Sequence, residues 1–169
     1  MSQIFPGRYT AQHDGPLVVF LIGMRVNKLW AFSKWWPVAM AMGPMIEALY
    51  RHPEKGFLGG RTLIEWPGVT MIQYWRSFED LEQFAKNPSD PHLGAWQRFN
   101  QAIGADGTVG IWHETFAVEA GKFESVYGNM PRTGLAAATG HGPITRGRNS
   151  ARERMRTETS APVEEFTAQ

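Results

Sequence analysis

Two of the five histidines lie in aromatic-rich stretches where regular elements are expected. His92 follows Asp90-Pro91 near the start of a helical segment, and His113 lies in the strand-like stretch 110–115. A neutral imidazole held by a helix is a good iron ligand, and a second imidazole can donate or accept a proton opposite it. If both point into one pocket, the pair fits the two sides of a flat cofactor such as haem b.

Ordinary structural roles remain open for both histidines. A histidine at a helix start is often a surface residue, and a strand histidine is often a core residue whose ring bonds to a backbone carbonyl. Alternation along the strand sorts its side chains into two faces, with Ile111, His113 and Thr115 on one and Trp112, Glu114 and Phe116 on the other. Glu114 therefore points away from His113, so the two are not expected to act as a dyad.

Four further residues are candidates for the same site. Trp96, Ile111 and Trp112 are expected to contact the cofactor, because large apolar side chains suit the wall of its pocket. Arg25, at the end of the first strand, can balance an anion such as a haem propionate or a substrate carboxylate. A surface salt bridge is the alternative role for Arg25.

The elements that must position these residues follow the order β-α-β-β-α-β. Apolar runs and alternation predict strands over 17–24, 56–66, 69–75 and 109–118, helices over 30–50, 77–87 and 90–104, and a short final strand over 123–127. This order is that of the ferredoxin-like α+β fold. One face of such a sheet carries no helix, so we expect two copies to pair sheet to sheet as a homodimer.

Local signals predict the boundaries of these elements. Pro37 suits the first turn of the long helix, and Gly43-Pro44 should kink or split it. Pro67-Gly68 predicts the turn of a hairpin. Ser77 followed by Asp80 resembles a capping box, with Asp in place of the usual Glu.

Length and composition divide the chain into three parts. The 169 residues suit one domain with a real core. Residues 1–15 are polar and are interpreted as an arm, and residues 16–138 form the ferredoxin-like domain. Residues 139–169 are charged and almost free of large apolar side chains, so we expect a flexible tail or an arm that wraps the partner subunit.

Composition also excludes several classes of function. The chain has no cysteine, which rules out disulfides, thiolate chemistry and iron–sulfur clusters. A net charge of +1 gives no basic field for nucleic acid. The apolar run 16–24 is too short to span a bilayer and no leader pattern precedes it, so a cytoplasmic protein with no membrane partner is expected.

Several segments resemble a known family. The stretches WRSFEDLEQFAKNPSDPHLGAWQRFN, GIWHETFAVEAGKFESVYGNMPRTGLAAA, VVFLIGMRVNKLW and HPEKGFLGG are similar to a bacterial and fungal family of monooxygenases that includes the fumagillin-pathway antibiotic-biosynthesis type. The similarity spans roughly residues 15 to 138. It implies a dimeric α/β-barrel fold and an oxidoreductase acting on a small-molecule substrate.

A more distant resemblance is to haem-dependent aldoxime dehydratases, which share the Pro-x-His-Leu helix and the Trp-His-Glu strand. That resemblance implies His92 as the proximal iron ligand and His113 as the distal acid or base. The same family uses a serine near the strand end that corresponds to Gly23-Met24-Arg25, where this chain has none. A haem-dependent monooxygenase or peroxygenase is therefore expected, with three alternatives left open: an aldoxime dehydratase-like lyase, a cofactor-free monooxygenase, or a non-catalytic haem or small-molecule binder.

Overall fold

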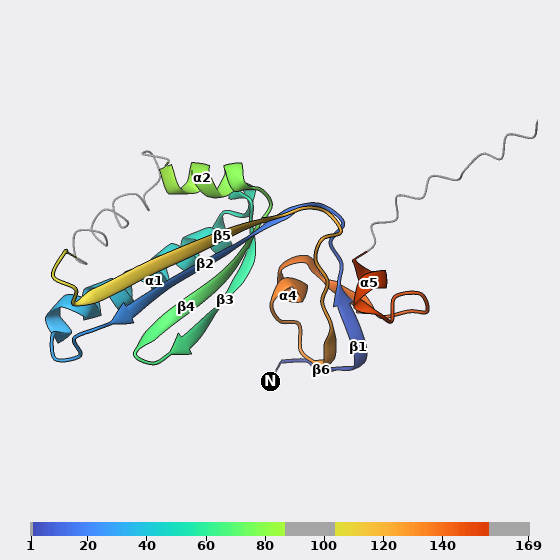
Figure 1. The fold of residues 1–169 in the computed structure, drawn as a ribbon, viewed down its shortest axis with the longest axis horizontal. Helices are drawn as coiled ribbons and strands as arrows, with labels where there is room; N and C mark the ends of the chain where they lie inside the picture. The colour runs from blue at the N-terminus through green and yellow to red at the C-terminus, as the bar shows by residue number, and fades with distance from the viewer. Residues whose placement is uncertain (1, 87–103, 156–169) are drawn as a thin grey trace, which may run out of the picture.

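The computed structural model describes residues 2–86 and 104–155. His92 and Trp96 lie outside the described residues. Within them, the chain forms two antiparallel sheets that lie side by side (Figure 1).

The main sheet has four strands, and each neighbouring pair is antiparallel. β2 (Leu17–Val26), β3 (Phe57–Glu65), β4 (Gly68–Trp75) and β5 (Val109–Val118) lie in the order β3-β4-β2-β5. With α1 (Phe32–Arg51) after β2 and α2 (Phe78–Lys86) after β4, this is the ferredoxin-like arrangement that the sequence predicts. A short 3₁₀ helix, η1 (Pro53–Lys55), joins α1 to β3.

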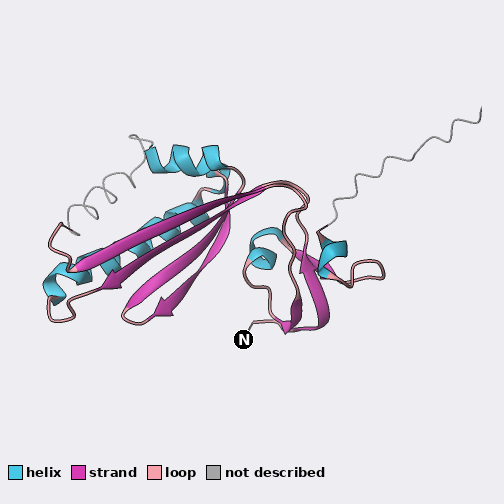
Figure 2. Cartoon of the chain, in the orientation of Figure 1, coloured by secondary structure: helices cyan, strands magenta, loops and turns pink. Residues whose placement is uncertain are grey.

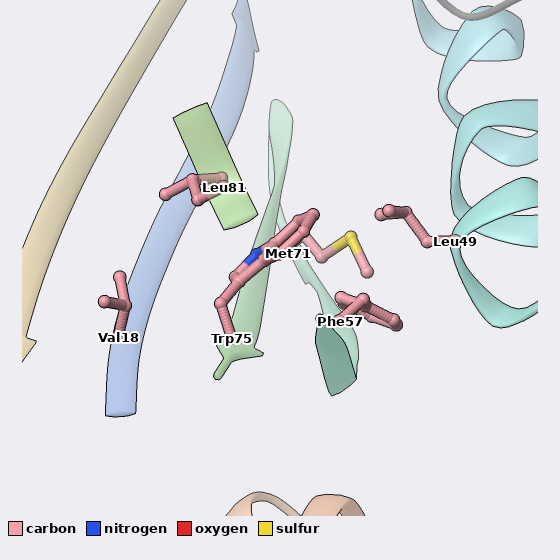
Figure 3. Packing of buried hydrophobic residues seen from close by; sticks show 6 residues of the cluster. All are labelled: Val18, Leu49, Phe57, Met71, Trp75 and Leu81. Atoms are coloured by element: carbon pink, nitrogen blue, oxygen red, sulfur yellow. The ribbon is translucent and has the colours of Figure 1, made fainter. Parts of the chain in front are cut away.

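One face of the main sheet, called here the helix face, packs against α1 and α2. Its core cluster joins strand residues to one residue from each helix: Val18, Phe57, Met71 and Trp75 with Leu49 and Leu81 (Figure 3). A second cluster places Val38 of α1 against Met24, Val26 and Val109. The indole N–H of the fully buried Trp75 donates to Gln73 Oε1 at 2.9 Å, so this core satisfies its own polar atoms.

α1 differs from the prediction in two ways. It begins at Phe32, near the predicted start, so Pro37 lies inside the helix rather than in its first turn, and the helix continues without a break through Gly43-Pro44. Two buried residues explain the continuity, because Val38 and Leu49 belong to different core clusters on either side of Pro44. Packing along the sheet therefore outweighs the backbone hydrogen bond that proline removes.

The other local signals agree with the structure. The predicted hairpin is present, and its turn is Trp66-Pro67, one residue before the predicted Pro67-Gly68, because Glu65 already pairs with Gly68. At the start of α2, Ser77 Oγ accepts the backbone N–H of Asp80 at 3.1 Å. The Asp80 carboxylate does not complete a capping box among the described residues and pairs instead with Arg76 at 2.9 Å.

The second sheet joins the two ends of the chain. β1 (Phe5–Ala11) lies between β6 (Tyr127–Met130) and β7 (His141–Pro143), with the short helices α4 (Leu135–Thr139) and α5 (Ala151–Arg154) beside it (Figure 2). The segment interpreted as an arm thus carries a strand, and the segment interpreted as a tail carries a strand and a helix. The pairing uses backbone groups, which every residue has, so polar composition did not reveal it.

An ion pair, in which only the arginine is buried, and an apolar cluster hold this part of the chain together. Arg154 of α5 donates to Glu124 at 2.9 Å and to two backbone carbonyls. Leu135 and Ala136 of α4 pack with Ala11 and Leu17. The same cluster includes Tyr74, which lies on the face of the main sheet that points away from α1. That face, called here the open face, is therefore covered at one end only.

Candidate functional site

His113 lies on the helix face of β5, the edge strand of the main sheet. The register pairs His113 with Ile22 and Thr115 with Phe20 on the neighbouring strand β2. Cross-strand partners point to the same side of a sheet, so these four side chains share one face. Ile111 shares it too, because it pairs with the buried Met24.

The imidazole of His113 is exposed and has an aromatic neighbour. Its ring centroid lies 5.7 Å from that of Phe20, with the planes 42° apart. Among the described residues no hydrogen bond to the imidazole is formed, so the backbone carbonyl partner of the ordinary structural interpretation is not found there. No described residue therefore prevents either ring nitrogen from binding a ligand.

The exposure of His113 follows from the position of β5. The core cluster that α1 and α2 form draws its strand residues from β2, β3 and β4. From Ile111 to Ala117, β5 is exposed at every residue. An edge strand that the described helices leave open offers room for a ligand on its helix face.

Arg25 and Trp112 are on the open face, on the other side of the sheet from His113. Trp112 pairs with Gly23, and Arg25 pairs with Gly110. The indole of Trp112 lies across Gly23, where an added Cβ would be only 2.4 Å from Nε1. The structure thus brings Ile111 to His113 and separates Arg25 and Trp112 from it.

Phe20 and Ile22 are the site residues that sequence reasoning missed. They lie in the run LVVFLIGM, which is apolar at every position and so gives no sign of which side chains face a pocket. Only the register with β5 places them beside His113. The predicted ranges of the two strands, 17–24 and 109–118, differ in length, so the sequence carried no signal of this register.

An ion pair at the start of β5 helps to hold this strand against α1. Asp106, in the loop before β5, pairs with Lys34 of α1 and accepts the backbone N–H of Thr108 at 2.9 Å. Hydrogen bonds from Lys34 and Thr108 hold the pKa of Asp106 well below its usual range. The carboxylate stays ionised at neutral pH and keeps this link.

The chemistry of the described residues fits one side of a flat cofactor. His113 supplies an imidazole, and Phe20, Ile22 and Ile111 supply apolar surface on the same face. Within residues 2–86 and 104–155, no group of three or more His, Asp or Glu side chains is placed to hold a metal ion by itself. The predicted iron ligand His92 and the predicted contact Trp96 lie outside the described residues.

A separate cavity of about 750 Å³ lies between the second sheet and α5. Much of its polar lining is already bonded: Ser125 Oγ accepts the backbone N–H of Ala11 at 2.9 Å, and Arg154 pairs with Glu124. This cavity does not include His113 or its neighbours. We therefore place the candidate site at β5.

No helix in the described part of the chain is long and apolar enough to cross a membrane.

Two solved structures share this fold. An aldoxime dehydratase (OxdRE) in complex with butyraldoxime matches 80% of this chain and 39% of its own, with a TM-score of 0.62 and 16% identity. A second aldoxime dehydratase matches 82% of this chain and 43% of its own, with a TM-score of 0.58 and 19% identity. At these identities the similarity establishes the fold alone.

Sequence comparison gives a closer relationship. Monooxygenase af470 of Aspergillus fumigatus (strain ATCC MYA-4609 / CBS 101355 / FGSC A1100 / Af293) is 30% identical over an alignment 151 residues long, which covers 76% of this chain and 53% of that protein. The chain thus spans about half the length of this relative. The pattern of one family, described as monooxygenase af470-like, matches residues 17–135, from the start of β2 to the start of α4. The chain belongs to the monooxygenase af470-like family.

Proposed function

We propose that this chain is a haem-dependent monooxygenase acting on a small organic substrate, with His92 as the iron ligand and His113 on the opposite side of the haem. The observation that carries the proposal is the position of His113. Its imidazole is exposed on the helix face, beside Phe20 and Ile22, and has no hydrogen bond to any described residue. Membership of a monooxygenase family supports the reaction class.

When bound, haem would supply the redox centre that uses oxygen with a reductant, or peroxide, to oxidise the substrate. His113 would hold a proton at one ring nitrogen and move it to or from the reacting oxygen. Phe20 and Ile22 would limit the access of water to that side and provide apolar contact for the substrate. Arg25 and Trp112, on the open face, would take no part in this pocket within one protomer.

A cofactor-free monooxygenase is the second candidate, and the same residue favours it. An imidazole whose ring nitrogens meet no described partner can serve as a general base toward an electron-rich substrate. An aldoxime dehydratase-like lyase has less support, because the strand segment that would carry its serine is Gly23-Met24-Arg25. Gly23 is covered there by the indole of Trp112, and Met24 is buried in the core.

We also propose that two copies pair through the open face of the main sheet. Leu21 and Ile72 lie opposite each other there and are half-buried, and Phe116 is exposed. α4 covers the neighbouring Tyr74 but not this stretch. An uncovered apolar sheet face of this kind is typical of an interface between subunits.

The absorption spectrum of protein purified from haem-supplemented cells tests the haem proposal. We expect a Soret band in the wild type and its loss or shift in His92→Ala. His113→Ala should retain haem but change its reaction with peroxide. His52→Ala is a matched control, because His52 is exposed and pairs with Glu54 away from β5.

Three outcomes would change the proposal. If the wild type shows no Soret band and takes up no haem on titration, the haem function is wrong and the cofactor-free candidate replaces it. If His113→Ala loses the iron ligation while His92→Ala keeps it, the two roles are exchanged. If haem binds but His92→Ala and His113→Ala both behave like the wild type and the control His52→Ala, neither His92 nor His113 belongs to the site.

A further inference from the structure

One end of the main sheet carries an exposed group of large apolar side chains that the proposed site does not use. Trp30 is 83% exposed, Ile64 is 88% exposed and Trp66 is 78% exposed. Leu29 and Phe32 are also exposed beside Trp30 in the sequence. Monomeric proteins rarely expose so much aromatic surface in one region without a partner.

These residues lie in or next to two connections that meet at the same end of the sheet. Trp30 lies in the loop between β2 and α1, and Trp66 lies in the turn between β3 and β4. The strand ends are adjacent, because Arg25 pairs with Gly68 and the backbone N–H of Val26 donates to the Pro67 carbonyl at 2.9 Å. Figure 1 shows this end of β2 and the β3–β4 turn at the same edge of the molecule.

The loop that carries Trp30 is held in place by hydrogen bonds. The indole N–H of Trp35 donates to the Leu29 carbonyl at 3.1 Å, and the backbone N–H of Ala31 donates to the Lys28 carbonyl at 3.0 Å. The backbone N–H of Asn27 donates to the Thr108 carbonyl at 2.9 Å. Little ordering is therefore needed before this loop contacts a partner.

The charges at this end favour an anionic surface. Between Asp14 and Glu47 the chain has three basic residues, Arg25, Lys28 and Lys34, and no acidic residue. Lys34 pairs with Asp106, but the ammonium of Lys28 donates to a backbone carbonyl and Arg25 forms no ion pair with a described residue. Two acidic residues offset part of this charge: Asp106, which pairs with Lys34, and Glu65 in the β3–β4 hairpin.

We propose that the Trp30 loop and the Trp66 turn dock this protein on the surface of a lipid membrane. Tryptophan favours the interface between headgroups and acyl chains, and neighbouring lysine and arginine side chains bind lipid phosphates. Neither indole is seated in a groove, as the high exposure of both shows. Two separate protruding side chains suit insertion into lipid better than the flat, closely packed centre of a protein interface.

This docking is compatible with the shortness of the apolar run in β2, which excludes only a spanning segment there. The sequence prediction of no membrane partner considered spanning alone. A protein that lies on the interface needs a few inserted side chains and a basic rim, and both come here from loops rather than from a continuous apolar segment. The proposal does not depend on haem or on His113.

Vesicle co-sedimentation tests the proposal. We expect the wild type to bind vesicles of phosphatidylcholine with phosphatidylserine more tightly than vesicles of phosphatidylcholine alone. Each of Trp30→Ser and Trp66→Ser should lower the partition coefficient about tenfold, because a large apolar side chain is no longer removed from water. Phe78→Ser is the matched control, since Phe78 is an exposed aromatic residue that follows β4 at the opposite end of the sheet.

A second set of variants addresses the charges and guards against misfolding. Lys28→Gln should weaken binding to the anionic vesicles and leave binding to the neutral ones unchanged. Trp30→Phe should restore most of the binding lost in Trp30→Ser, and circular dichroism should be the same for all variants. The proposal is overturned if the wild type binds neither vesicle, or if the Ser variants bind as well as Phe78→Ser. If the wild type binds no vesicles and Trp30→Ser also alters the oligomeric state, the proposal is overturned and this surface instead joins copies of the chain.

Discussion

At the scale of single residues, a substitution at Gly23 would affect both faces of the main sheet. Its lack of a side chain lets the indole of Trp112 lie flat across β2, and an added Cβ would meet that ring at 2.4 Å. On the opposite face, the neighbouring position Ile22 lies beside His113. A change at Gly23 therefore disturbs the open face directly and the candidate site through the backbone.

We expect Gly23→Ala to lower the free energy of unfolding by about 1–3 kcal/mol, because the Trp112 ring must leave its place or the strand must shift. Denaturant unfolding measures this change, and a red shift of tryptophan fluorescence would accompany displacement of the indole. Gly43→Ala in α1 is the control, because apart from its chain neighbours and its own helix backbone no atom lies within 4 Å of the added Cβ, so this change should lower the free energy of unfolding less than Gly23→Ala does. Equal effects of the two changes would show that Trp112 does not rest on Gly23.

Asp80 gives a pH dependence with a defined sign. The hydrogen bond from Arg76 lowers the pKa of the Asp80 carboxyl, and Ser77 adds to the effect. A carboxyl whose pKa is lower in the folded state stabilises the fold above its unfolded pKa, and this contribution is lost as the pH falls through the folded pKa. Asp80→Asn should therefore reduce the melting temperature at neutral pH and differ less from the wild type in acid.

The melting temperatures of both proteins, measured from neutral pH downward, check this expectation. Glu79→Gln is the matched control, because Glu79 is an exposed acidic residue of the same helical turn. A difference between Asp80→Asn and the wild type that stays constant with pH would mean that the Arg76 pair does not stabilise the fold.

At the scale of elements, α5 is joined to the connection between β5 and β6 by one buried side chain. Arg154 is buried, and its guanidinium joins Glu124 to the carbonyls of Arg148 and Asn149. Ser150 and Glu153 form a capping box that begins the helix. A helix of four residues cannot be stable without such contacts.

Arg154→Ala should detach this helix and lower the free energy of unfolding by about 1–2 kcal/mol, because Glu124 is only partly buried and regains water. Limited proteolysis should then cleave the segment 144–155 faster than in the wild type. Arg152→Ala, on the exposed side of the same helix, should change neither measurement. Equal cleavage of the two variants would contradict the role given to Arg154.

At the scale of the whole molecule, the main sheet has one face covered by helices and one largely open. If two copies pair through the open face, Ile72→Asp or Phe116→Asp should convert the dimer to a monomer, because a carboxylate would be buried without a partner. Sedimentation equilibrium measures the change. Met40→Asp is the control, because Met40 is exposed on α1. A wild type that is monomeric at all concentrations would exclude this assembly.

The membrane-docking surface and the proposed dimer interface occupy different parts of the molecule. The docking residues Trp30 and Trp66 lie at one end of the sheet, whereas Leu21 and Ile72 lie within its open face. The candidate site lies on the helix face, beside His113. The three proposals can therefore be tested by separate substitutions, and the failure of one leaves the others standing.

The sequence by itself determined the strands and helices of the main sheet and the alternation along β5. These features depend on neighbouring residues: turn dipeptides such as Pro67-Gly68, the spacing of apolar side chains, and the parity that separates Ile111 from Trp112. The capping role of Ser77 was predictable for the same reason. A candidate histidine on a strand face could thus be named before any contact was known.

Only the tertiary structure decided which side chains surround that histidine. Strands pair through backbone groups that all residues share, so the residue types in the apolar run of β2 do not specify its register with β5. That register places Phe20 and Ile22 beside His113, and it leaves Arg25 on the other face of the sheet. The same reason hid the pairing of Tyr9 with Pro143, which joins the two ends of the chain. Side-chain pattern determines an element, whereas its neighbours depend on how the whole chain buries its apolar surface.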